Sequence, residues 1–83
     1  MKPIASISRY PDGRLAEIFI TSNKNGSDAD AAARDASITC SLALQFGCPA
    51  EVIRHALLRD ARGVASSPLG AALDLLAFEG ATK

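Results

Sequence analysis

Two end signals enclose one long helix, and this helix constrains the fold of the chain more than any other feature. Ser27-Asp28-Ala29-Asp30 has the form of a capping box, and its acidic residues suit the positive end of a helix. Gly47 supplies the left-handed residue that follows many helices, and Pro49 prevents continuation. We therefore expect a helix over residues 27–47, with Gly47 at positive φ.

The expected helix carries two apolar stripes at helical spacing. Small side chains form one of them, at Ala29, Ala32, Ala33, Ala36, Cys40 and Ala43, and beside it lie the bulkier Ile38, Leu42 and Phe46. Small side chains allow another backbone to approach closely. We expect most of the helix circumference to be buried, with the sheet or a second copy of the chain against the alanine stripe.

The residues before this helix predict a β-hairpin over residues 1–22. Ile, Phe, Ser and Thr are frequent in Ile4–Tyr10 and Arg14–Ser22, and Pro11-Asp12-Gly13 between them is typical of a turn. Both faces of the second strand carry apolar side chains, so both faces require cover. Because an isolated two-stranded hairpin is not stable in water, helices must cover at least one face.

Two further helices are expected after the long one. Pro49 at a first helical position opens a helix over residues 49–60, and Ser67-Pro68 opens another over residues 67–79. The predicted fold class is therefore α+β, with a two-stranded β-hairpin followed by three α-helices. The whole chain, residues 1–83, forms one domain.

The length of 83 residues limits how large a core the chain can build alone. A chain of this size buries about 60 to 65% of the surface that its unfolded form exposes, so its core is marginal. One helical layer also covers only one face of the hairpin. We therefore expect a homo-oligomer, a dimer or a larger assembly, in which a second copy completes the core.

The charge pattern bears on possible partners. Nine basic residues balance nine acidic ones, which argues against binding to duplex nucleic acid or to a membrane surface. No apolar run approaches the roughly 20 residues that span a bilayer, and Met1-Lys2-Pro3-Ile4 lacks the apolar region of a signal peptide. The expected location is the cytoplasm.

Residues with catalytic or metal-binding chemistry are few. The chain has two cysteines and one histidine, Cys40, Cys48 and His55, and their spacing matches no known zinc motif. We expect both cysteines to be thiols and His55 to be a partly exposed helical residue. Accordingly, no catalytic residue, metal or cofactor is predicted, although a hydrolase or redox enzyme using His55 or Cys48 is a third alternative.

Ligand-binding candidates lie in two places. A glycine-containing loop that enters a helix offers free backbone N–H groups to an anion, which makes candidates of Lys24, Asn25, Gly26 and Ser27. Arginines are candidates because their guanidinium groups bind phosphate, namely Arg34 and a second cationic cluster of Arg54, Arg59 and Arg62. The alternatives are that the loop only caps the helix and that the arginines only form a solvated surface.

Several stretches of the chain carry a family resemblance. These are Arg14–Ile20, Gly26-Ser27-Asp28, Ser41–Gly47, Pro49–Ile53 and the tail Ser67–Asp74. In them the chain resembles the TSCPD domain family, which forms the C-terminal domain of adenosylcobalamin-dependent ribonucleotide reductases and also occurs as small stand-alone proteins in bacteria and phages. The match to the domain covers about Asp12 to Leu58, and the tail Ser67–Asp74 resembles that of the stand-alone members.

The resemblance implies a role without catalysis, because the reductase requires a large barrel that 83 residues cannot hold. The implied function is that of a stand-alone module associated with ribonucleotide reductase or nucleotide metabolism, which acts by oligomerisation and binding. Its partners are then other copies of itself, with a nucleotide ligand or a reductase as further candidates. The alternative is a phage-type sponge that binds a nucleotide signal in pockets between subunits.

Overall fold

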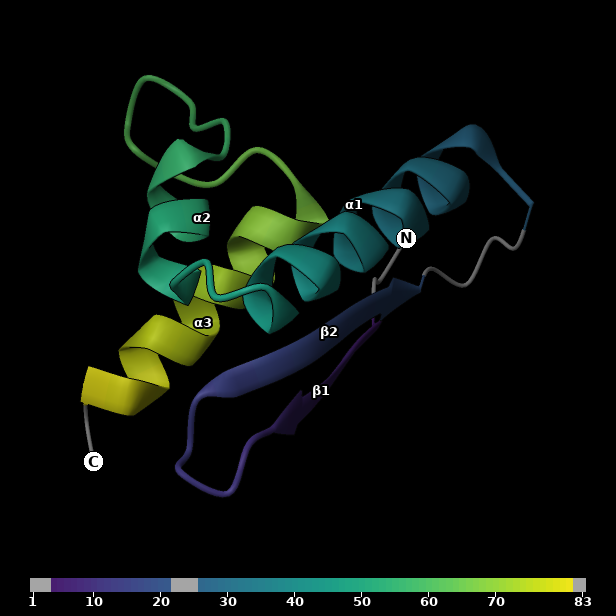
Figure 1. The fold of residues 1–83 in the computed structure, drawn as a ribbon. Coiled ribbons are helices and arrows are strands. Elements are labelled where there is room, and N and C mark those ends of the chain that lie inside the picture. Colours follow the sequence, from purple (N-terminus) through teal and green to yellow (C-terminus); the bar gives the residue numbers. More distant parts are fainter. Residues whose placement is uncertain (1–3, 22–25, 82–83) are drawn as a thin grey trace.

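The computed structural model describes residues 4–21 and 26–81 of the chain. The elements follow in the order β1 (Ile4–Arg9), β2 (Leu15–Thr21), α1 (Asp28–Gln45), α2 (Ala50–Ala56) and α3 (Pro68–Ala81). The predicted α+β fold, a two-stranded hairpin followed by three helices, is confirmed. Helix α1 runs along β2, while α2 and α3 lie beside the C-terminal half of α1 (Figure 1).

The hairpin pairs β1 with β2 in antiparallel register, with Ile7 opposite Ile18. Its turn is held by the backbone N–H of Gly13, which donates to the Tyr10 carbonyl at 2.9 Å. The carboxylate of Asp12 accepts from the backbone N–H of Arg14 at 3.0 Å, an Asx-type contact that favours a turn over a longer strand.

Both predicted ends of α1 are confirmed. The Ser27 hydroxyl accepts from the backbone N–H of Asp30 at 3.1 Å, which satisfies one of the free donors of the first turn. At the other end Gly47 has φ 97°, and the N–H of Cys48 reaches back to the carbonyl of Ala43 at 2.9 Å. These are the bonds of a Schellman motif, which requires the left-handed residue that glycine supplies at little cost.

Helix α2 is shorter than the predicted 49–60, because it ends at Ala56 and Leu57 is extended, with φ −78° and ψ 151°. The Asp60 carboxylate accepts from the backbone N–H groups of Arg62 and Val64, at 2.8 and 3.0 Å. Such local bonds compete with helical ones and form a turn over residues 60–64, immediately after the predicted end of the helix.

Helix α3 begins one residue after its predicted start and ends at Ala81, two residues beyond the predicted 79. The Ser67 hydroxyl accepts from the backbone N–H of Gly70 at 3.1 Å and caps the first turn. Gly70 is buried, and a Cβ atom there would lie 3.1 Å from the Cβ of Ala65. This close approach places the start of α3 against the connection that precedes it.

The core lies between β2, α1 and α3. Its buried residues are Ile18, Ile20, Ala33, Cys40, Leu44, Leu69 and Leu73. Within one subunit the expectation that most of the α1 circumference is buried is wrong, since Ala29, Ala32 and Ala36 are exposed and the bulky Ile38 and Leu42 are about half exposed. Of the small-residue stripe, Ala33 and Cys40 are buried. The face that packs on β2 includes two serines instead, Ser37 and Ser41, which are 1% and 5% exposed.

Ser41 explains why α1 presents this face. Its hydroxyl accepts from the Ile18 N–H and donates to the Ile18 carbonyl, both at 2.9 Å. These two backbone groups point to the edge of β2 that β1 does not cover, because successive residues of an antiparallel strand alternate in direction. The hydroxyl therefore replaces a missing strand neighbour and fixes the helix on the sheet.

Replacing Ser41 with alanine should destabilise the fold by about 2 kcal/mol, because the buried N–H and carbonyl of Ile18 lose their partner. The matched control is Ser37→Ala, since the Ser37 hydroxyl bonds only to the Arg34 carbonyl of its own helix and should cost under about 1 kcal/mol. Urea unfolding followed by circular dichroism measures both. Equal losses in the free energy of unfolding for the two variants would contradict the bridging role of Ser41.

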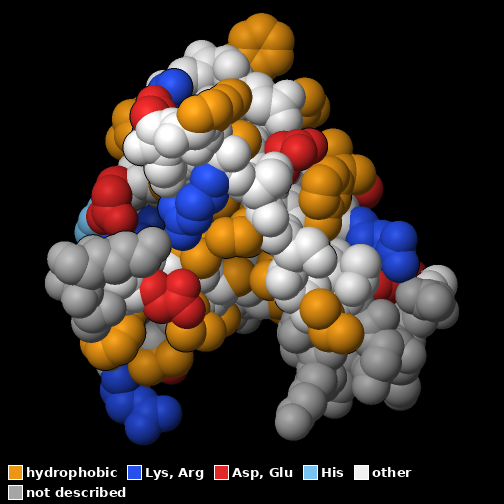
Figure 2. Space-filling view, turned by 90° about the horizontal axis from the view of Figure 1, so that it is seen from below, with side chains coloured by type: hydrophobic (Ala, Val, Ile, Leu, Met, Phe, Trp, Pro, Cys, Tyr) orange, Lys and Arg blue, Asp and Glu red, His pale blue; other side chains and the backbone are white. Residues whose placement is uncertain are grey.

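Much apolar surface stays outside the core. In the face shown in Figure 2, hydrophobic side chains reach the surface at many points between charged side chains of both signs. Strand β1 is exposed along its whole length, and Ile7 is 40% exposed although its cross-strand partner Ile18 is fully buried. At the C-cap of α1, Phe46 is 90% exposed. Helix α1 thus covers β2 but leaves β1 without cover.

Candidate functional site

The described part of the predicted loop site is organised around one carboxylate. Lys24 and Asn25 lie outside the described residues. Asp30 is buried, and its Oδ2 accepts from the Gly26 N–H at 3.4 Å and from Nε of Arg34 at 2.9 Å. Because Arg34 pairs with Asp30 and Ser27 caps the helix, the described contacts are those of a helix start.

The predicted arginines of the second group are in different environments. Arg59 makes a two-pronged ion pair with Asp74, at 2.7 and 2.8 Å, whereas Arg62 is exposed in the connection between α2 and α3. This connection and the start of α1 lie at opposite ends of the molecule (Figure 1). The described residues of the two predicted groups therefore do not form one site within a single subunit.

Asp74 joins α3 to α2 and to the connection. Besides the bonds from Arg59, its Oδ1 accepts from Nε of Arg54 at 2.8 Å. The hydrogen bonds from Arg59, and secondly those from Arg54, hold the pKa of Asp74 well below its ordinary value of 3.8. The sequence grouped Arg54 with Arg59 but gave no signal for their partner, because Asp74 follows Arg59 by fifteen residues and Arg54 by twenty.

Replacing Asp74 with asparagine should lower the melting temperature near pH 7. It should also make the stability of the fold depend less on pH in the acid range. A carboxyl group with a depressed pKa stabilises the fold above its ordinary value, here 3.8, and this contribution is lost as the pH falls towards the folded pKa. The difference between wild type and variant should therefore shrink below about pH 4. Asp35→Asn, at an exposed position of α1, is the control, and a constant difference down to pH 2 would contradict the ion pair.

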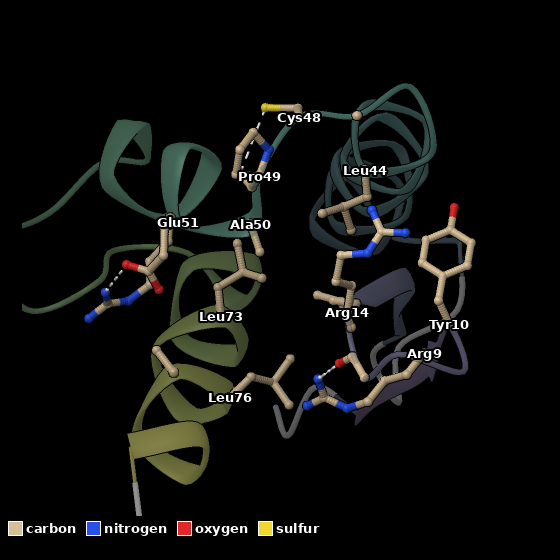
Figure 3. A pocket seen from close by; sticks show the side chains of 15 residues that line it. Arg9, Tyr10, Arg14, Leu44, Cys48, Pro49, Ala50, Glu51, Leu73 and Leu76 are labelled. Atoms are coloured by element: carbon tan, nitrogen blue, oxygen red, sulfur yellow. Dashed lines mark hydrogen bonds and ion pairs between the residues drawn. The ribbon is translucent and has the colours of Figure 1, made fainter.

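A cleft of about 400 Å³ opens between the turn end of the hairpin and the helices. Figure 3 shows its two sides, with Arg9, Tyr10 and Arg14 of the hairpin facing Leu73 and Leu76 of α3. The floor is apolar and includes Leu44 at the end of α1. The turn Gly47-Cys48-Pro49 closes one end, so the cleft exists because α1 stops there and α2 turns away.

The hairpin reaches the cleft through an irregularity of its register, between Ser8 and Arg9. Such a bulge re-aims side chains. By strict alternation Leu15 would share the outer face with Phe19, yet it packs against the core cluster and lines the cleft. Sequence reasoning missed this cleft because its walls come from three segments far apart in the chain, residues 9–15, 44–54 and 73–77.

The charged side chains at the cleft are mostly basic. Arg9, Arg14 and Arg54 line it against one carboxylate, that of Glu51. Arg14 pairs with Asp12 at 2.7 Å, and its guanidinium lies 4.9 Å from the centre of the Tyr10 ring, as in a cation–π contact. The cleft thus combines an apolar floor with three arginines, of which Arg14 and Arg54 pair with carboxylates and Arg9 bonds to a backbone carbonyl.

The thiols and the histidine do not form a catalytic pair. Both cysteines are free, and burial raises the pKa of the Cys40 thiol, so it is a core residue rather than a nucleophile. His55 is exposed on α2, as predicted, and its Nε2 lies 3.2 Å from Glu51. Among the described residues, no three His, Cys, Asp or Glu side chains converge as metal ligands would, and no described helix has the length and apolarity to cross a bilayer.

One curated protein is similar to part of the chain. A vitamin B12-dependent ribonucleotide reductase of Rhodopirellula baltica is 43% identical over 47 residues, which cover 57% of this chain and 4% of the reductase. The match suggests a relationship to the ribonucleotide reductase family. No family model matches the chain, and no solved structure matches it. The resemblance to the TSCPD domain therefore stays a prediction.

Proposed function

We propose that the chain is a non-catalytic, TSCPD-like module of nucleotide metabolism that associates with itself and with a ribonucleotide reductase. The observation that carries this proposal is the 43% identity with a segment of a vitamin B12-dependent ribonucleotide reductase. That segment amounts to 4% of a much longer protein, so the shared part is a small module and not the bulk of an enzyme. The whole reductase's activity is not carried over to this chain.

Self-association is supported by the exposed hairpin. Phe19 is 45% exposed and Ile4 63% exposed, and the register places both on the face turned away from α1. Strand β1 is also an edge strand, with a row of backbone groups that another chain can pair with. A second copy that covers this face would bury apolar surface that the three helices leave in water.

The purified chain should therefore elute above its monomer mass of 8.6 kDa in size exclusion with light scattering, run at several concentrations. Phe19→Asp should shift it to the monomer, because an unpaired charge in an apolar contact is costly. Val64→Asp is the matched control, since Val64 is 56% exposed in the connection, away from the hairpin. A wild-type protein that is monomeric throughout would overturn self-association.

Association with the reductase follows from the same surface. Because the reductase contains a segment of similar sequence, a surface that pairs two copies of this chain can also pair one copy with that segment. The test measures binding of the labelled chain to immobilised, purified reductase of R. baltica by interferometry. We expect saturable binding that Phe19→Asp weakens at least about tenfold and Val64→Asp leaves unchanged. Absence of binding would overturn the proposed association.

The sponge alternative places a nucleotide in pockets between subunits. Its predicted residues Arg34 and Arg59 pair with Asp30 and Asp74, so their guanidinium groups already have acidic partners. A cleft within one subunit is better suited to a small anion, and of its lining residues only Arg54 belongs to the ligand-binding groups that the sequence had indicated.

A further inference from the structure

The cleft beside the hairpin turn has the construction of a small-molecule site. Its volume of about 400 Å³ falls within the roughly 300 to 1,000 Å³ typical of ligand pockets. Leu15, Leu44, Leu73 and Leu76 supply an apolar lining. Arg9, Arg14, Arg54 and Glu51 add charged groups, and a lining of both kinds suits a ligand with one apolar end and one charged end.

Arg9 is the rim residue with spare charge. Its Nη1 donates to the Gly13 carbonyl at 2.9 Å, a neutral acceptor, and no carboxylate of the described residues pairs with it. Arg14 and Arg54 differ, because Arg14 pairs with Asp12 while Arg54 pairs with Glu51 and Asp74. The bond to Gly13 uses one of the five donors of a guanidinium, so Arg9 can still offer the others to an anion.

Arg14 contributes to the same rim although it is paired. Asp12 binds its Nε at 2.7 Å, and the Tyr10 ring lies 4.9 Å from its Cζ. These two contacts restrict the largely exposed guanidinium, which reduces the entropy lost when its remaining donors bind a ligand. Tyr10 itself is half-buried and adds a flat aromatic surface at the mouth of the cleft.

We propose that this cleft binds a nucleoside phosphate, with the phosphate at Arg9 and Arg14 and the nucleoside over the apolar floor. Guanidinium groups match the geometry of phosphate oxygens, and a base can lie against leucine side chains or the Tyr10 ring. The inference that the ligand carries a phosphate follows from the cleft alone. The inference that its other part is a nucleoside rests on the proposed function.

The test is calorimetric titration of the isolated chain, without any reductase, with four probes. These are AMP, adenosine, inorganic phosphate and phenyl phosphate. We expect AMP to bind at least about tenfold more tightly than adenosine or inorganic phosphate, because each of those fills only one half of the cleft. Equal binding of AMP and inorganic phosphate would overturn the role of the apolar floor, and equal binding of phenyl phosphate would overturn the assignment to a nucleoside.

Two variants with matched controls locate the site. Arg9→Gln should weaken AMP binding about tenfold through loss of a charged hydrogen bond, whereas Arg62→Gln removes the same charge from the exposed connection and should have no effect. Ala77→Phe fills the cleft from α3 and should abolish binding, while Ala71→Phe adds the same group at an exposed position of α3 outside the cleft. Circular dichroism checks that all four variants fold.

The outcomes separate this site from its competitors. Loss of binding in Arg62→Gln but not in Arg9→Gln would place the ligand at the connection and overturn the cleft. Absence of AMP binding to the wild-type chain at millimolar concentration would overturn the cleft site while leaving association with the reductase untouched, because that association is measured without nucleotide. If the chain binds AMP but does not bind the reductase, the cleft site is supported and the proposed association is overturned.

Discussion

The bond between the Ser41 hydroxyl and the backbone of Ile18 determines how the two layers of the molecule meet. A hairpin of two strands has two open edges, and α1 lies along the open edge of β2 and over the face that carries Ile18 and Ile20. Since one helix cannot cover two strands fully, β1 stays exposed. The uncovered apolar surface of the hairpin is thus a direct result of where Ser41 anchors the helix.

The position of the cleft is determined by the C-terminal end of α1. Gly47 turns the chain sharply, and Pro49 starts α2 in a new direction, so α2 and α3 do not continue along the hairpin. Asp74 then ties α3 to α2 through Arg54 and Arg59 and holds this pair of helices as one wall. The hairpin turn forms the opposite wall. The space between these walls is kept open by rigid contacts on both sides.

Features that depend on a few neighbouring residues could be predicted from the sequence. The cap at Ser27, the left-handed Gly47 and the hairpin turn each reside in four or five residues, and all were confirmed. The rotation of α1 could not be predicted, because hydropathy assigns buried positions to alanine and exposed ones to serine. Ser37 and Ser41 reverse this pattern, since a serine hydroxyl can be buried once it has a backbone partner.

The candidate site was less predictable than the fold for a similar reason. The sequence predicted Arg34 and Arg59 as ligand-binding residues without showing their ion-pair partners. A guanidinium group is fully available to a ligand only if no carboxylate of the protein is paired with it. Asp30 lies four residues before Arg34, a spacing visible in the sequence, whereas Asp74 becomes the partner of Arg59 only through the fold. The sequence around Arg9 contains no motif that predicts ligand binding.

At the cleft, Arg9 is the lining arginine that has no carboxylate partner among the described residues. Arg9 follows a strand bulge, and its only described partner is a carbonyl group. A pairing surface on the outer face of the hairpin, at Phe19, does not require the cleft residues, since the bulge turns Leu15 away from that face and into the core. Assembly through the hairpin and binding in the cleft can thus occur in one subunit without competing for the same side chains.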